Sequence, residues 1–161
     1  MLKTKTLTLF WRNHEVFSNW YPSEFVVEGQ GFNCGEQWMM YSKAKLFGDH
    51  EVAAKILAEA IPRRQKELGR KVHGFDEAIW DAQCEDLVYT GLREKFRQNP
   101  ELLEVLRATG DTLIAEASPT DRIWGIGLEE EDPRAHDPSK WRGQNRLGKV
   151  LMRVRQTLLA A

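Results

Sequence analysis

Residues 76–98 read DEAIWDAQCEDLVYTGLREKFRQ, the longest helical pattern in this chain of 161 residues. Asp76 is a good N-cap, and the pattern stops at Asn99-Pro100, because the residue before a proline disfavours helical backbone. The apolar positions recur at helical spacing and are Ile79, Trp80, Cys84, Leu87, Val88, Gly91, Leu92 and Phe96. The stretch predicts a long helix at the centre of a mainly helical protein.

Shorter patterns extend in both directions from this helix. Helices are predicted at Gly35–Leu46, Glu51–Ala60, Pro62–Gly69, Glu101–Ala108 and after Asn145. Strands are predicted at Thr6–Trp11, at Thr112–Ala117 and in a hairpin from Phe25 to Phe32 that turns at Gly29-Gln30-Gly31. Residues 128–141 are acidic and then rich in proline, which favours a solvated loop, a candidate lid. We expect one α+β domain over residues 1–161, mainly helical with a small β-sheet.

The composition is that of an ordinary globular protein, with 42% hydrophobic and 29% charged residues. The net charge of −1 provides no broad basic field to recruit nucleic acid or a membrane. Residues 1–5 are too polar for a signal peptide, and no apolar run approaches the roughly 20 residues of a membrane span. These features predict a cytoplasmic location and no membrane partner.

Cysteine and histidine content points away from metal and disulfide chemistry. Cys34 and Cys84 form no CxxC pair, and Cys34 is interpreted as a packing residue in preference to a nucleophile. The four histidines lack the spacing of metal ligands, so neither a metal nor a cofactor is expected.

Two segments near the end of the chain carry the strongest functional signal: Asp121-Arg122-Ile123-Trp124-Gly125-Ile126-Gly127 and Gly143-Gln144-Asn145-Arg146-Leu147-Gly148. The glycines beside Trp124 predict uncovered backbone amides, and amides at the start of the last helix can hold an anion. A carboxylate, an aromatic face and free amides suit a planar base linked to a phosphorylated sugar. In the alternative interpretation, Asp121 only caps a turn after Ser118-Pro119-Thr120.

Glu36 and Lys43 lie seven residues apart, which places both on one face of the predicted Gly35–Leu46 helix. On a half-buried face flanked by Met39, Met40 and Phe47, each would shift the pKa of the other, and the pair could share catalytic work. The alternative is an exposed ion pair that contributes less than about 1 kcal/mol.

Aromatic and basic residues supply further candidates for the site. Stacking of a base on Trp80 or Trp124 would contribute roughly 1–3 kcal/mol, although Trp80 could equally be a core residue. Arg70 belongs to a basic cluster with Arg63, Arg64 and Lys66, which is either a phosphate site or a solvated helix face.

Taken in order, these motifs resemble the YbiA-like family, also called NADAR. The resemblance is carried by the segments Phe17–Ser23, Glu36–Ala44, Gly69-Arg70, Trp80, Asp121–Gly127 and Asn145–Gly148. It implies a YbiA-like fold and an N-glycosidase that hydrolyses the ribosyl–nitrogen bond of phosphorylated ribosylaminopyrimidines, the early intermediates of riboflavin biosynthesis. Other family members remove ADP-ribose from guanine bases in nucleic acid, which gives a second candidate substrate. A module that binds NAD or ADP-ribose derivatives without catalysis, or a purely structural domain, would be the non-enzymatic alternatives.

Under the resemblance, Glu36 stabilises the oxocarbenium-like transition state, and Asp121 holds a ribose hydroxyl or ring nitrogen. Lys43 either binds phosphate or attacks the sugar carbon C1 as a neutral amine. The residues expected to bind substrate are Asn19, Arg70, Trp80, Trp124, Gly125 and Asn145. We expect Glu36, Lys43 and Asp121 to meet at one pocket, and the absence of a basic stripe favours a small metabolite over nucleic acid.

Overall fold

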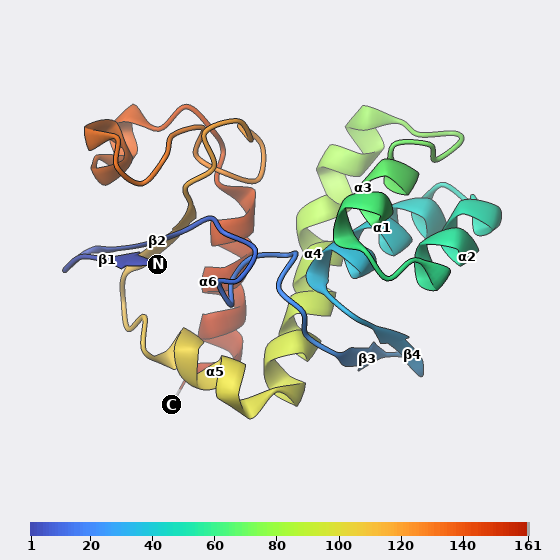
Figure 1. The fold of residues 1–161 in the computed structure, drawn as a ribbon, viewed down its shortest axis with the longest axis horizontal. Helices are drawn as coiled ribbons and strands as arrows, with labels where there is room; N and C mark the ends of the chain where they lie inside the picture. Colours follow the sequence, from blue (N-terminus) through green and yellow to red (C-terminus); the bar gives the residue numbers. More distant parts are fainter. Residues whose placement is uncertain (161) are drawn as a thin grey trace. The chain divides into compact units, whose positions relative to one another are not determined.

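The computed structural model describes residues 1–160 and has the α+β architecture that the sequence predicts, with six α-helices and two small sheets (Figure 1). The chain forms two compact units, which are described separately. Unit 2 is Asn19–Asn99, and unit 1 combines Met1–Ser18 with the chain from Pro100 onward. Unit 2 is therefore inserted in the sequence of unit 1. Whether the two units make one domain stays a prediction.

Unit 2 is built around helix α1, Gly35–Leu46, which packs against α2 (His50–Ala58), α3 (Pro62–Gly69) and α4 (Glu77–Gln98). The contact with α4 is close because the Trp38 indole lies over Gly91, where a Cβ atom would come within 2.1 Å of the ring. The Trp38 Nε1–H also donates to the carbonyl of Leu87 at 2.7 Å. The helix that carries Glu36 and Lys43 is thus held on three sides.

The helix limits in unit 2 follow the capping signals in the sequence. Asp49 and Asp76 cap α2 and α4 with their carboxylates, and Pro62 begins α3. Strands β3 (Phe25–Val27) and β4 (Gln30–Phe32) form the expected hairpin. The predicted turn is wrong, however: Glu28 and Gly29 form it with positive φ angles of 51° and 81°, and Gln30 and Gly31 belong to the second strand.

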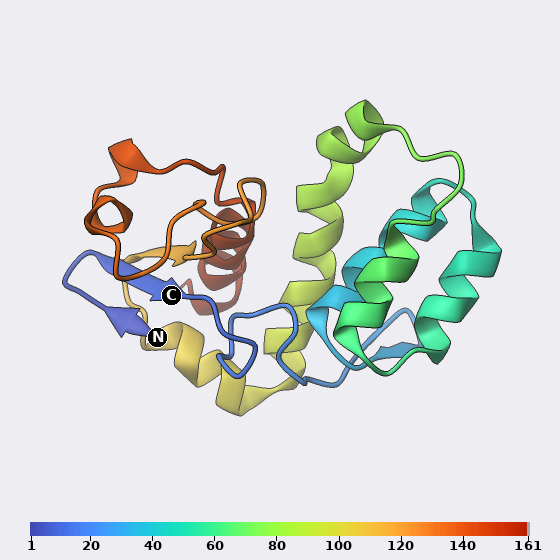
Figure 2. The ribbon, with the colours of Figure 1, turned by 45° about the horizontal axis from the view of Figure 1, so that its top comes forward.

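Unit 1 contains a three-stranded sheet in the order β1 (Leu2–Lys3), β2 (Leu7–Phe10) and β5 (Leu113–Glu116). Strand β1 is antiparallel to β2, whereas β2 and β5 are parallel with Leu7 opposite Leu113. Helix α6 (Arg146–Leu159) packs on β5, as Figure 2 shows, and also contacts α5 (Pro100–Arg107). The core between these elements contains Leu7, Leu9, Ala115, Ala117 and Ile126.

The segment from 128 to 141 is more ordered than predicted. It contains two short 3₁₀ helices, η1 (Pro133–His136) and η2 (Pro138–Lys140), and it buries Leu128 and Ala135 in the core of unit 1. The Trp141 Nε1–H donates to the Ala135 carbonyl at 2.8 Å. The prediction of a solvated loop is therefore wrong, because aspartates that cap each 3₁₀ helix and two small apolar contacts fix the chain.

The apolar stripe of α4 also differs from its prediction in two places. Ile79 is 44% exposed, whereas Lys95 is completely buried. Burial lowers the pKa of Lys95 to about 7, and the Cys34 thiol only partly opposes that effect. Within residues 1–160, no helix has both the length and the apolarity needed to cross a membrane.

Candidate active site

Helix α1 carries both members of the predicted catalytic pair, Glu36 and Lys43. Glu36 lies in the first turn and is only 3% exposed, while Lys43 lies near the end of the helix and is half-buried. A carboxylate in the first turn is favoured by the helix dipole. Because Glu36 is buried, the alternative of an exposed surface ion pair is wrong.

Three influences act on the pKa of Lys43, two that lower it and one that raises it. Burial has the largest effect and lowers the pKa of the ammonium, and the positive charge of Arg70 lowers it further. The negative charge of Glu36 acts in the opposite direction and raises the pKa. The net result is a lysine whose pKa lies below its ordinary value, so its neutral form is more accessible than that of an exposed lysine.

Asn19 contacts the start of α1 directly. Its carbonyl accepts a hydrogen bond from the Glu36 N–H at 2.8 Å, and its side chain packs against Gly35. A Cβ atom at position 35 would lie 2.5 Å from the Asn19 Oδ1 atom, so only glycine fits. Oδ1 is buried and has no hydrogen-bond partner among the described residues. A buried acceptor without a partner costs roughly 1–3 kcal/mol, which a donor group on a ligand would recover.

Basic and aromatic side chains surround Lys43. Arg70 is exposed at the end of α3, and it is the member of the basic cluster whose charge acts on Lys43. The Lys43 Nζ atom lies 4.5 Å from the centre of the Phe75 ring, and Phe75 packs edge-on against Phe47. Trp80, one of the two predicted stacking residues, is 9% exposed, which leaves little of its indole face for a ligand.

In unit 1, Asp121 performs the structural role that the alternative interpretation assigns to it. Its Oδ1 atom accepts hydrogen bonds from the N–H groups of Ile123 and Trp124, both at 2.9 Å. The Asp121 N–H in turn donates to the Ser118 hydroxyl at 3.1 Å. A role in substrate binding would fall to the second carboxylate oxygen.

The two C-terminal motifs pair with one another through main-chain hydrogen bonds. The N–H groups of Asn145, Arg146 and Leu147 donate to the carbonyls of Gly125, Ile123 and Trp124, at 3.1, 3.2 and 3.1 Å respectively. The prediction that amides at the start of the last helix are uncovered is therefore wrong for these residues.

Asn145 occupies the N-cap position of α6 in a left-handed conformation, with φ of 51°, but its side chain does not cap the helix. Its Oδ1 accepts from the Glu116 N–H at 3.2 Å, and its Nδ2 donates to the Ile114 carbonyl at 3.0 Å. Both polar atoms thus bind strand β5. Position 148 accommodates only glycine beside these contacts, because a Cβ atom there would lie 2.0 Å from the Ile114 oxygen.

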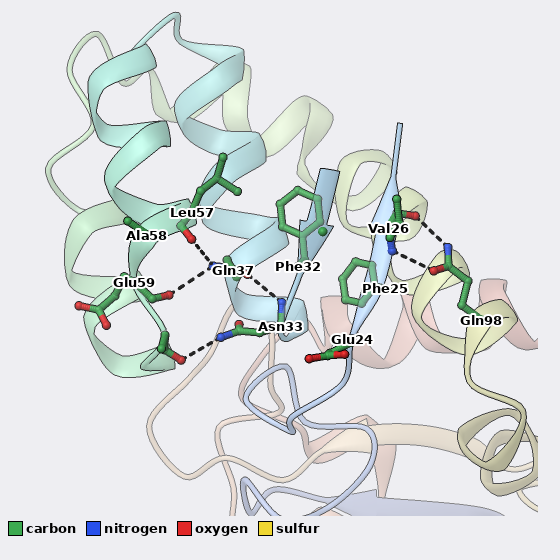
Figure 3. Close-up of a pocket in the computed structure, with 12 residues that line it drawn as sticks. Glu24, Phe25, Val26, Phe32, Asn33, Gln37, Leu57, Ala58, Glu59 and Gln98 are labelled. Carbon is green, nitrogen blue, oxygen red and sulfur yellow. Dashed lines mark hydrogen bonds between the residues drawn. The ribbon is translucent and has the colours of Figure 1, made fainter. Parts of the chain in front are cut away.

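A cavity of about 500 Å³ in unit 2 lies beside the β3–β4 hairpin, and none of the predicted site residues lines it (Figure 3). The buried Gln37 Oε1 atom accepts from the Asn33 N–H, and Nε2 donates to the carbonyls of Ile56, Leu57 and Glu59. Glu24 and Glu59 line the cavity, and no basic residue does. A phosphorylated ligand would therefore be repelled.

Cys34 is buried, and its Sγ–H donates to Gln65 Oε1 at 3.2 Å. Burial raises the pKa of this thiol to about 11, so it remains protonated, as the packing interpretation expects. Among residues 1–160, no group of three or more histidine, cysteine or acidic residues is arranged to hold a metal ion.

One known protein family matches nearly the whole chain. The NADAR domain matches residues 9–159. The chain belongs to the NADAR family.

Relatives in the NADAR family extend over most of the chain. Protein irg-1 of Caenorhabditis elegans is 41% identical, over 97% of this chain and 81% of its own length. N-glycosidase R617 of Acanthamoeba polyphaga mimivirus is 44% identical, over 88% of this chain and 86% of its own. Riboflavin biosynthesis protein VVA0006 of Vibrio vulnificus is 32% identical over 91% of this chain but only 36% of its own. The mimivirus relative, named an N-glycosidase, identifies the chain as an enzyme of that class.

The NADAR fold is also supported by a solved structure. The NMR structure of the Escherichia coli protein YbiA superimposes with a TM-score of 0.79 at 26% identity, covering 98% of this chain and 88% of YbiA. The predicted YbiA-like fold is confirmed.

Sequence reasoning missed Phe75 and Lys95. An apolar residue just before an N-cap ordinarily packs on the first turn of its helix, so Phe75 would be interpreted as a local staple. Its position before Asp76 and shortly after Arg70 was the available signal. Lys95 gave no signal, because a lysine in a helix is ordinarily exposed.

Proposed function

We propose that this NADAR enzyme hydrolyses the ribosyl C1–N bond of phosphorylated ribosylaminopyrimidines, removing reactive intermediates of riboflavin biosynthesis in the cytoplasm. One observation carries the proposal: a buried carboxylate, Glu36, shares helix α1 with the half-buried ammonium of Lys43, on which Arg70 also acts. The names of the related N-glycosidases and of the Vibrio riboflavin biosynthesis protein support both the bond and the pathway.

Cleavage of a C1–N bond passes through a transition state in which the ribose carries positive charge. The Glu36 carboxylate is suited to stabilise that charge, because burial removes the water that would screen it. The same carboxylate can accept a proton from the attacking water. The oxygen of that water bonds to C1, the bonding electrons pass to the departing nitrogen, and the proton reaches that nitrogen.

Lys43 and Arg70 supply the positive charge that a phosphorylated ligand requires. In the proposed binding mode they hold the phosphate, while the Asn19 Oδ1 atom, unpaired within residues 1–160, accepts from a ribose hydroxyl or an amino group of the base. The lowered pKa of Lys43 also keeps attack by its neutral amine on C1 as an alternative. Asp121, Trp80, Trp124, Gly125 and Asn145 stay predicted site residues.

The proposal is tested by incubating the protein with a ribosylaminopyrimidine phosphate and measuring free ribose 5-phosphate. Glu36→Gln should reduce kcat by at least about a hundredfold, because the variant keeps the shape of the side chain but loses its charge. Glu51→Gln is the matched control, since the Glu51 carboxylate is 81% exposed and pairs with Lys55 on the same helix.

A parallel assay with an ADP-ribosylated guanine oligonucleotide separates the two candidate substrates. Turnover of the oligonucleotide alone would contradict the proposed substrate but retain the N-glycosidase reaction. Equal turnover by Glu36→Gln and the unaltered protein would remove Glu36 from the mechanism.

A further inference from the structure

Phe75 is an exposed aromatic residue placed against the proposed catalytic lysine. It lies in the loop between α3 and α4, and 44% of its surface is accessible. The Lys43 ammonium lies over its ring at 4.5 Å from the centroid. The Phe47 ring packs against it at 5.4 Å with an interplanar angle of 68°. Both contacts come from the C-terminal end of α1, so the ring is anchored where Lys43 emerges.

The loop that carries Phe75 is fixed on both sides. The Asp49 Oδ2 atom, at the start of α2, accepts hydrogen bonds from the N–H and the Nδ1 atom of His73, both at 2.9 Å. Gly74 then adopts φ of 75°, a conformation that glycine tolerates, and Asp76 caps α4. Because an aspartate fixes the chain on each side of Phe75, its ring has a defined position.

An ammonium ion over an aromatic face is attracted by the negative face of the ring. This attraction favours the charged form of Lys43 and restricts the rotation of a long side chain. The other charged groups that act on Lys43 are Glu36 on its own helix and Arg70 after α3. The aspartates at the starts of α2 and α4 are engaged by His73 and by main-chain N–H groups. The contact with the Phe75 ring therefore favours charged Lys43, whereas burial and Arg70 favour its neutral form.

We propose that Phe75 is a positioning residue, whose ring face holds the Lys43 side chain in the orientation that the reaction requires. This inference rests on the proposed role of Lys43, but the contact can be measured without turnover. Phe75→Leu removes the aromatic face and keeps apolar bulk, whereas Phe75→Tyr keeps the face. Ile79→Ala is the control, because Ile79 is also 44% exposed and lies one turn further along the chain.

The first measurement is the pKa of Lys43 in full-length protein whose lysines carry ¹³C-methyl groups, followed by NMR. The signal is assigned by its loss in Lys43→Arg. Phe75→Leu should lower the pKa of Lys43 by about half a unit, the shift expected from a partly exposed cation–π contact. Phe75→Tyr and Ile79→Ala should leave it unchanged. An unchanged pKa of Lys43 in Phe75→Leu would overturn the proposal.

The second measurement is the pH profile of kcat/KM for release of ribose 5-phosphate. Phe75→Leu should lower kcat/KM about fivefold and move the limb assigned to Lys43 to lower pH by the same half unit. Phe75→Tyr should restore both. Equal losses in the leucine and tyrosine variants would contradict the role of the aromatic face. If the unaltered protein releases no ribose 5-phosphate, the proposed function fails, and the NMR titration still decides the role of Phe75.

Discussion

The two units of this protein use their polar groups in different ways. In unit 2, Asn19 Oδ1 is buried and has no hydrogen-bond partner among the described residues. In unit 1, Asp121 Oδ1 and both polar side-chain atoms of Asn145 are already bonded to the main chain. Unit 2 thus keeps a buried hydrogen-bond acceptor at Asn19 that a ligand can use. In unit 1, by contrast, the Asp121 and Asn145 side chains use these polar atoms to hold the fold.

This difference teaches that a motif can be specific to a family for structural reasons. The glycines beside Trp124 predicted bare amides open to a ligand. In the structure, Gly125 and Gly143 lie where two stretches of the chain approach closely, and a Cβ atom at Gly143 would lie 2.2 Å from the Gly125 oxygen. Substitutions in the two units should therefore have different consequences.

The largest expected effect is on Lys43 in unit 2. Lys43→Met should lower kcat/KM about a hundredfold or more, because the site loses either its phosphate-binding charge or its nucleophile. The matched control is Lys45→Met, on the same helix but exposed. Steady-state release of ribose 5-phosphate measures both. Comparable losses in the two variants would show that α1 contributes only general charge.

Gly148→Ala tests the structural role of unit 1. The added Cβ atom would meet the Ile114 oxygen and the Asn145 side chain, so the free energy of unfolding should fall by about 2 kcal/mol. Gly31→Ala is the control, since no atom lies within 4 Å of the position of its added Cβ. Chemical denaturation measures the difference. A Gly148→Ala protein as stable as the control would contradict the close packing of α6 on β5.

Asp121→Asn sharpens the comparison, because it removes charge and keeps the oxygen that accepts from Ile123 and Trp124. If the carboxylate holds substrate as predicted, kcat/KM should fall about tenfold, the equivalent of 1.4 kcal/mol, with little change in thermal unfolding. Asp121→Ala should lose stability as well, by about 1 kcal/mol, because the turn loses its cap. Full activity in the asparagine variant would restrict Asp121 to structure.

The remaining effect expected is on the pH dependence of stability, and Lys95 contributes it. Its pKa is lowered from 10.5 to about 7 in the folded protein, so between these two pH values the unfolded chain binds more protons than the folded chain. Stability should therefore rise with pH above 7, with a slope of at most about 1.4 kcal/mol per pH unit. Urea denaturation at a series of pH values measures the slope, which should be smaller in Lys95→Met. An identical slope would show that Lys95 is not the titrating group.

Local signals predicted the helices well, because caps and breakers act within a few residues. The limits of Gly35–Leu46 and the start of Glu77–Gln98 after Asp76 are as predicted. The hairpin turn was misplaced, because the turn uses Glu28 with a positive φ, which few residues other than glycine adopt.

The site was predicted only in part, because its contacts join distant residues. The spacing of Glu36 and Lys43 was sufficient to place them on one helix. The pairing of Asn145 with strand β5, 31 and 29 residues away, leaves no trace in local sequence. The meeting of Glu36, Lys43 and Asp121 at one pocket stays a prediction.

The insertion of unit 2 between strands β2 and β5 has a consequence for the order of events during synthesis. Leu7 emerges from the ribosome early, but its parallel neighbour Leu113 is made only after every residue of unit 2. Contacts between such distant positions form slowly, since the chain must first close a long loop. The edge of β2 that will pair with β5 therefore stays unpaired until β5 is synthesised. A chaperone that covers exposed strand edges would act most usefully in that interval.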